Sequence, residues 1–250
     1  MSEEWSHYVA RMGGHSASIV FDDGISETIK SLPENMSILV TADLVEFNDF
    51  NMPTDHEAER LEILQNALDV VVEGVGGYSV GRVTSNKKRH HFYYASEMSD
   101  EIAQALYSAA EVTGHQLNIG RRNDPDKDAY FDDLYPDPES RQVVNDMNLI
   151  RLLVEKGDDL HVARRIDHLS IFKSKHAATA YSEWAMTEGY DVDPIRKEGP
   201  LFAKTYNVET HNETAVTVYA INPHSLGHHR KAVELGGTYD GWGTTVVPKT

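Results

Sequence analysis

The stretch Leu235–Thr244 constrains the fold of this chain more than any other, because it sets four glycines among a tyrosine, an aspartate and a tryptophan. Glycine adopts backbone conformations that residues with side chains resist. A helical pattern ends just before the stretch, and the β-branched run Thr244–Val247 follows it. We therefore expect Gly236 and Gly237 to end a helix, and a final strand to follow that is bulged or closely approached near Gly241.

Two interpretations of this stretch remain open. In a strictly alternating strand Tyr239 and Trp242 would face opposite sides, whereas a one-residue bulge would bring them to the same side. The stretch is then either a structural corner with a buried tryptophan or a recognition patch on the surface. Neither interpretation needs a catalytic residue. The residues of this candidate recognition or structural motif are Gly236, Gly237, Tyr239, Asp240, Gly241 and Trp242.

Length and composition favour two ordinary domains in a reducing compartment. A chain of 250 residues with 40% apolar content is long enough for two cores. The absence of cysteine excludes disulfides and thiolate metal sites. No signal peptide and no apolar run long enough to span a membrane are visible. These features predict a cytoplasmic protein.

The net charge of −17 is concentrated in the first half of the chain. Residues 1–139 hold 10 Lys and Arg against 26 Asp and Glu, a net of −16, while residues 140–250 hold 13 against 14, a net of −1. An acidic surface repels phosphate backbones, so direct nucleic-acid binding by the first half is disfavoured. It would attract a basic partner, or it serves only solubility.

We expect residues 1–136 to form an acidic α+β domain, an antiparallel sheet packed with two helices. The first helix follows a capping box at Thr54 and Glu57, in which each residue bonds the backbone amide of the other. The second helix begins after Ser99. Alternating and β-branched runs predict strands at 5–12, 15–21, 36–42, 78–84, 90–95 and 116–122.

The prolines at 136 and 138 mark a boundary, so we expect the second domain to cover residues 137–250. A helix begins it. The patterns beyond that helix predict a strand over 161–172, a helix over 174–188, strands over 190–197 and 201–211, a polar helix and a final strand. The polar helix covers 222–235 or starts one turn earlier, and residues 214–221 also have an extended pattern, which would make one strand an extra. This βαββαβ order is that of a ferredoxin-like sandwich with its last strand at a sheet edge. The predicted fold class is α+β.

The second half resembles the regulator of ribonuclease E activity B family over roughly residues 160–248. The resemblance is carried by the run Ala232–Gly243, with its Tyr-Asp-Gly-Trp core, and by the helix-to-strand step at Gly189-Tyr190. It implies a non-catalytic protein that binds and inhibits the endoribonuclease of the RNA degradosome. Members of that family are typically acidic in this domain, and residues 140–250 depart from that pattern.

The first half is similar to an uncharacterised domain often fused ahead of that family. This resemblance rests on Glu57 with the following helix, the strand Val80–Thr84, His91–Tyr94 and Leu134–Pro136. That resemblance implies no activity.

An enzyme is disfavoured, and no cofactor is expected. His224 and His228 have the four-residue spacing of a metal pair, but the residues between them include no glutamate and Arg230 follows closely, so we expect solvated histidines and no metal site. His168 alternates with apolar neighbours and is interpreted as a core histidine. The sequence contains no nucleophile elbow, Cys-His pair or dinucleotide fingerprint.

The leading hypothesis is therefore a regulator that binds a protein partner, a ribonuclease by resemblance. One alternative is an enzyme or small-molecule binder that uses a cleft between the two domains. Another is an RNA-binding protein that uses Lys87, Lys88 and Arg89 with the aromatic run His90–Tyr94, although alternation divides those aromatics between two faces.

Overall fold

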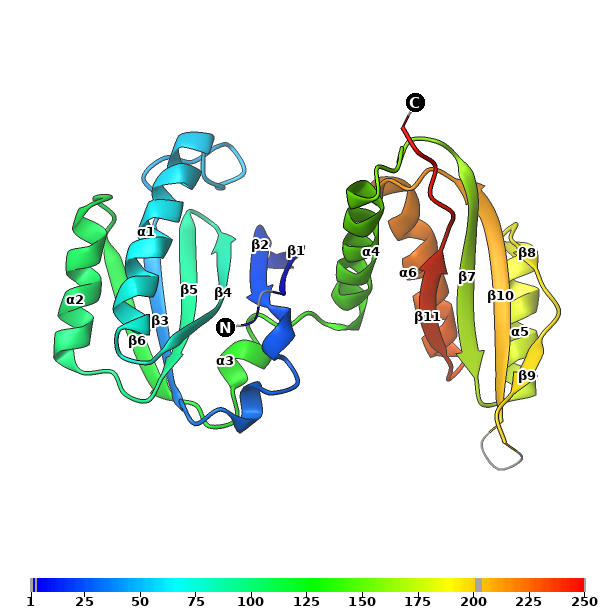
Figure 1. Cartoon of the computed structure of the whole chain (residues 1–250), viewed down its shortest axis with the longest axis horizontal. Coiled ribbons are helices and arrows are strands. Elements are labelled where there is room, and N and C mark those ends of the chain that lie inside the picture. The colour runs from blue at the N-terminus through cyan, green and yellow to red at the C-terminus, as the bar shows by residue number, and fades with distance from the viewer. Residues whose placement is uncertain (1, 3, 201–203, 250) are drawn as a thin grey trace. The chain divides into compact units, whose positions relative to one another are not determined.

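A computed structural model describes residues 2, 4–200 and 204–249. The chain divides into two compact units, Met1–Pro136 and Asp137–Thr250. Each unit holds one antiparallel sheet with helices packed on it (Figure 1), which confirms the predicted α+β class. Of the helices in the described ranges, none combines the length and apolar character that crossing a membrane requires.

Unit 1 is a six-stranded sheet whose neighbours are all antiparallel, in the order β1-β2-β4-β5-β3-β6. Two-residue turns, at Gly13-Gly14 and at Asn86-Lys87, join the pairs β1–β2 and β4–β5 with positive φ at all four residues, as tight hairpins require. The strands are β1 Trp5–Met12, β2 His15–Asp22, β3 Met36–Asp43, β4 Tyr78–Ser85, β5 Lys88–Ala95 and β6 Leu117–Asn123. All six strands expected from the sequence are present.

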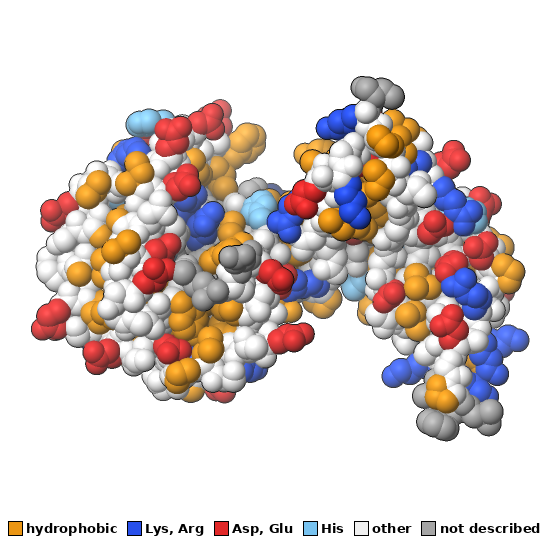
Figure 2. Space-filling model, viewed as in Figure 1, with side chains coloured by type: hydrophobic (Ala, Val, Ile, Leu, Met, Phe, Trp, Pro, Cys, Tyr) orange, Lys and Arg blue, Asp and Glu red, His pale blue; other side chains and the backbone are white. Residues whose placement is uncertain are grey.

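Two long helices, α1 (Asp55–Glu73) and α2 (Asp100–Glu111), pack on this sheet and bury the apolar stripe of α1 against β3 and β5. The main core of unit 1 is made by Ile38, Val40, Leu61, Leu64, Leu68, Val72, Tyr93 and Leu106 with their neighbours. A short helix, α3 (Asp128–Phe131), and the 3-10 turns Asp23–Ile25 and Ile29–Ser31 complete the unit. Acidic side chains are scattered over the face of unit 1 shown in Figure 2.

Only half of the predicted capping box forms. Thr54 Oγ1 accepts a hydrogen bond from the Glu57 amide at 3.2 Å. The Glu57 carboxylate does not return to the Thr54 amide. It accepts instead from the Val45 amide and contacts the His115 ring, because these partners meet it in the protein interior.

Unit 2 begins with helix α4 (Pro138–Glu155), which packs against α6, and its sheet has the strand order β11-β7-β10-β8, with the short β9 also paired to β10. The remaining elements are β7 Arg164–Phe172, α5 Lys175–Thr187, β8 Asp191–Val192, β9 Arg196–Glu198, β10 Thr205–Thr214, α6 Val218–Glu234 and β11 Thr238–Gly243. Helices α5 and α6 lie on one face of this sheet (Figure 1). The predicted position of the last strand at a sheet edge is confirmed.

The sequence patterns are wrong in two places in unit 2. Residues 218–221 are not extended: they form the first turn of α6, which starts one turn before residue 222 and follows the extended N-cap Thr217. Pro223 lies inside the helix and removes one i→i−4 hydrogen bond from it. The strand expected over 190–197 is broken into β8 and β9, with Pro194 between them. Residues 201–203, at the start of another expected strand, lie outside the described residues.

Candidate functional site

The glycine pair at the end of α6 forms a Schellman cap. The Gly237 amide donates to the carbonyl of Ala232 at 2.8 Å, and the Gly236 amide donates to that of Val233 at 3.0 Å. Gly236 has φ +71°, the left-handed conformation that this cap needs. Gly237 is required for a different reason: a Cβ there would lie 2.3 Å from Phe172 Cδ1. The expected helix end is therefore present.

A β-bulge at Asp240 decides which side chains of the motif turn inward. The register of β11 against β7 shifts between Tyr239, opposite Ser170, and Gly241, opposite Leu169. Gly241 has φ +123°, which glycine adopts without strain. Tyr239 and Trp242 consequently both face the helices, 6% and 9% exposed, while Asp240 is exposed to solvent.

Tyr239 enters a layer of buried histidines between the sheet and the helices. Its hydroxyl lies 2.8 Å from His168 Nδ1, and its ring stacks on that of His228 at an interplanar angle of 15°. The His168 and His228 rings are 4.3 Å apart between centroids. Burial lowers the pKa of His168 to about 4 and that of His228 to about 2, so both rings are neutral at pH 7.

Tyrosine hydroxyls hold the histidines of α6 from the other side. The Tyr181 hydroxyl lies 2.5 Å from His228 Nδ1 and accepts a hydrogen bond from Ser170. The Tyr190 hydroxyl lies 2.6 Å from His224 Nδ1. His228 Nε2 has no partner in the described part of the chain. This layer is a neutral, hydrogen-bonded core and not a set of solvent-facing bases.

The expectation of solvated histidines on α6 is therefore wrong. His228 is fully buried and His224 is half-buried, because α6 turns this face toward β7 and α5 and a tyrosine hydroxyl bonds Nδ1 of each ring. His168 is a buried core histidine with two hydrogen-bond partners, Tyr239 and Asn212. Within the described ranges no three His, Asp or Glu side chains are grouped as a metal site requires.

The other inward residue of the motif, Trp242, reaches α4. Its Nε1 donates to Asp146 Oδ1 at 2.9 Å, and Ser225 of α6 donates to the other oxygen of the same carboxylate. Burial raises the pKa of Asp146, against the opposite effect of its hydrogen bonds from Ser225, Trp242 and Gln142. The motif thus ties the edge strand to both helices that flank it.

Asp240, the outward residue of the motif, lies on the face of the unit 2 sheet opposite to helices α5 and α6. The outward residues of β7 and β10 are charged (Arg165, Asp167, Glu209 and Glu213), apolar (Leu169 and Ile171) or polar (Thr205, Asn207 and His211). No helix in the described residues of unit 2 covers this outer face. A shallow hollow of about 270 Å³ lies here, lined by Asp167, Leu169, Glu209, Asp240 and Gly241 among others. We call this surface the outer face; its acidic side chains are Asp167, Asp191, Asp193, Glu198, Glu209, Glu213 and Asp240, and its arginines are Arg165 and Arg196.

In unit 1 the aromatic residues that follow Lys87, Lys88 and Arg89 in β5 do not form a surface on which nucleic-acid bases could stack. His91, Phe92, Tyr93 and Tyr94 are buried on the two faces of β5. Bases could therefore not stack on them, which counts against the RNA-binding alternative.

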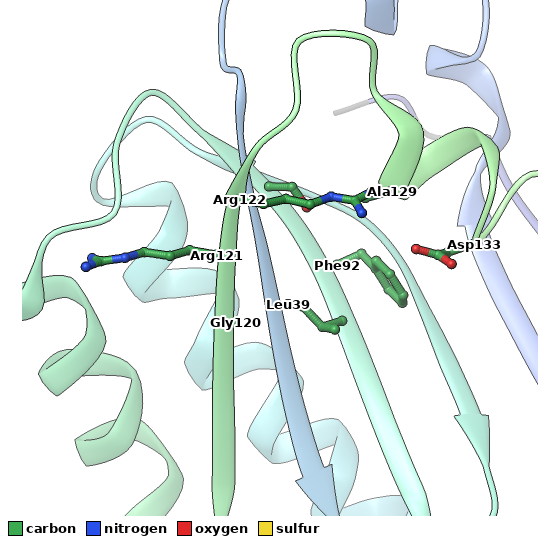
Figure 3. Close-up of a pocket in the computed structure, with 8 residues that line it drawn as sticks. Leu39, Phe92, Gly120, Arg121, Arg122, Ala129 and Asp133 are labelled. Carbon is green, nitrogen blue, oxygen red and sulfur yellow. The ribbon is translucent and has the colours of Figure 1, made fainter.

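A separate pocket of about 230 Å³ in unit 1 has an apolar floor formed by Leu39 and Phe92 (Figure 3). Arg122 and Asp133 lie at its rim, whereas Arg121 points in the opposite direction, away from both. Arg122 is already engaged with Asp124 at 3.7 Å. The Asp124 carboxylate in turn accepts hydrogen bonds from the Asp128 and Ala129 amides at the start of α3, so the rim of this pocket is part of the local structure.

Comparison with known proteins finds one family in each half. A family model described as "Regulator of ribonuclease activity B" matches residues 145–244, and one described as "Family of unknown function (DUF695)" matches residues 3–135. These matches confirm both resemblances drawn from the motifs. A search of curated proteins gives no match.

Two solved structures share low similarity with the chain. One is the crystal structure of an unknown protein from Galdieria sulphuraria, at 10% identity over 82% of this chain and 96% of that one, with a TM-score of 0.23. The other is a putative glycine cleavage system transcriptional repressor, at 7% identity over 84% and 98%, with a TM-score of 0.24. Scores this low do not establish a shared fold.

Proposed function

We propose that this chain, which belongs through residues 3–135 to the DUF695 family of unknown function, regulates a ribonuclease by protein contact through its second unit. The match of residues 145–244 to a regulator of ribonuclease activity supports the regulatory role. It also supports a non-catalytic mechanism. We take the strand order β11-β7-β10-β8 as that of a ferredoxin-like sandwich, which leaves one sheet face for a partner.

The observation that carries the proposal is the division of the motif between two faces. Tyr239 and Trp242 are buried inside unit 2, whereas Asp240 lies on the outer face near Asp167 and Glu209. The acidic side chains there surround the partly buried Leu169. Such a surface suits a basic segment of a protein partner, because complementary charge speeds encounter and fixes register.

The open edge of β11 adds a second means of contact. Within the described residues this strand pairs only with β7, so its outer backbone groups can receive another strand. Addition of an extended segment to a sheet edge gives affinity through main-chain hydrogen bonds. We propose that a basic, extended segment of the ribonuclease binds at this edge.

The test is direct binding of the full chain to a purified ribonuclease, with the degradosome endoribonuclease as the first choice, followed by an RNA-cleavage assay. Replacing both Asp167 and Asp240 by Lys should weaken binding by about tenfold and relieve inhibition in proportion. Glu183→Lys, an exposed position on α5, makes the same kind of charge change on the other side of the unit and should leave binding unchanged.

A native chain that neither binds the ribonuclease nor slows cleavage contradicts the proposal. Equal weakening by Glu183→Lys would place the contact elsewhere. Cleavage of RNA by the chain alone would favour an enzyme.

A further inference from the structure

A polar groove of about 650 Å³ in unit 1 plays no part in the proposed function. It lies beside α1, over strands β1, β2, β4 and β5, and within the volume range of small-molecule sites. Its lining includes the apolar side chains of Trp5 and Val20, the polar side chains of Gln65 and Asp69 from α1, and two arginines, Arg82 and Arg89.

The arginines come from neighbouring strands and share one face of the sheet. Arg82 of β4 lies opposite His91 of β5, and Arg89 lies opposite Thr84, so the two arginines are diagonal neighbours. Arg89 Nε donates to Thr84 Oγ1 at 2.8 Å. In the described part of the chain neither guanidinium has a carboxylate within 4.0 Å, and the Arg82 side chain has no hydrogen bond. Most of their ten N–H donors, about five per guanidinium, thus have no protein acceptor.

Burial makes this pairing of like charges costly. Burial, and then the neighbouring Arg82, lower the pKa of Arg89 to about 10. Burial also lowers the pKa of Arg82, although Asp69 and Glu62 oppose that shift. An anion between the guanidinium groups would remove their repulsion and supply the missing acceptors.

Two carboxylates, Glu62 and Asp69, also line the groove, and Asp69 is engaged in a hydrogen-bond chain through Gln65. Gln65 Nε2 donates to Asp69 Oδ1 at 2.7 Å and to Tyr93 Oη at 3.2 Å. This orientation turns Gln65 Oε1 to His91 Nδ1, 2.6 Å away. His91 is fully buried between Arg89 and Tyr93 on the same face of β5, and its Nε2 has no partner in the described residues. The polar floor of the groove is therefore ordered by hydrogen bonds, but His91 Nε2 still lacks a partner in the part of the chain that the structure describes.

We propose that this groove binds a small molecule through a phosphate or carboxylate group that Arg82 and Arg89 hold with charge-assisted hydrogen bonds. Arginine forks match the oxygens of either group in a bidentate manner. The rest of the molecule lies against Trp5 and Val20. The ribonuclease contact of unit 2 is not needed for this binding.

The experiment is isothermal titration calorimetry of the full chain with inorganic phosphate and, separately, with acetate. Saturable binding of one anion per chain is expected. Arg82→Gln and Arg89→Gln should each weaken it by about tenfold, the effect of losing a charge-assisted contact. The stronger of the two probes identifies whether the natural ligand offers a phosphate or a carboxylate.

Lys88→Gln is the matched control, because it removes a positive charge one residue away from Arg89 at an exposed site paired with Asp43. Its binding should stay within about twofold of the native chain. If Arg89→Gln does not fold, Arg82→Gln alone tests the proposal. Absence of saturable binding by both anions, or equal weakening by Lys88→Gln, overturns it.

Discussion

Trp242 of the edge strand donates its indole N–H to Asp146 of α4 at 2.9 Å, across 96 residues of sequence. The same carboxylate accepts from Ser225 of α6, so three elements of unit 2 meet at one buried acidic group. The indole is thereby a structural residue, and the contact with a partner is left to the outward side of the motif at Asp240.

Replacing Trp242 by Ala should destabilise the chain by about 3–5 kcal/mol, the usual cost of removing a buried aromatic side chain. Trp242→Phe keeps part of the packing but removes one donor to Asp146, and should cost about 1–3 kcal/mol. Urea unfolding followed by circular dichroism measures both. Loss of partner binding by Trp242→Ala with unchanged stability would instead show that the side chain is part of the contact surface.

Gly237→Ala should cost about 2–3 kcal/mol, because the added methyl would collide with the Phe172 ring and with the carbonyl of Ile171, 2.8 Å away. Gly243→Ala, at the end of β11, meets nothing within 4 Å and should change stability by no more than about 0.5 kcal/mol. Thermal unfolding of the pair separates the two glycines. Similar values for both would mean that Phe172 moves aside freely.

The elements of unit 1 could be predicted because their signals are local. Thr54 and Ser99 cap their helices, and strand alternation depends only on neighbouring residues. The bulge in β11 also followed from local glycines. Whether it exposes or buries Trp242 did not follow, because that depends on α4, far away in sequence.

The histidine layer could not be predicted for the same reason. His224 and His228 lie on a helix whose sequence is polar, and their burial depends on hydroxyls from Tyr190 and Tyr181 on other elements. The outer face and the arginine groove likewise bring together side chains from separate strands. The spacing of residues along the chain does not indicate which side chains from separate elements come into contact.

Acid should destabilise unit 2 through His168 and His228. Their folded-state pKa values, about 4 and about 2, lie below the ordinary value of 6.5, so the unfolded chain binds protons that the folded chain does not. Stability contributed by the neutral rings is complete above pH 6.5 and is lost as pH falls from there toward the folded-state pKa values. The loss at pH 5 should be on the order of 2 kcal/mol for each histidine.

The measurement is the difference in unfolding free energy between pH 7 and pH 5. His168→Gln and His228→Gln should each shrink that difference, even if they lower stability at both pH values. His56→Gln, at an exposed site paired with Glu46, is the control. An unchanged difference in both buried variants would show that other groups govern the acid response.

In unit 1, Glu57→Ala should destabilise the chain by about 3–5 kcal/mol, because it removes one member of a buried charged network. The carboxylate accepts from the Val45 amide at 2.7 Å, lies 3.0 Å from His115 Nε2 and pairs with Arg60 at 3.2 Å. Glu59→Ala, exposed on the same turn of α1, should stay within about 0.5 kcal/mol of the native chain. Urea unfolding compares them, and a cost for Glu57→Ala as small as that for Glu59→Ala would mean that water replaces the carboxylate without penalty.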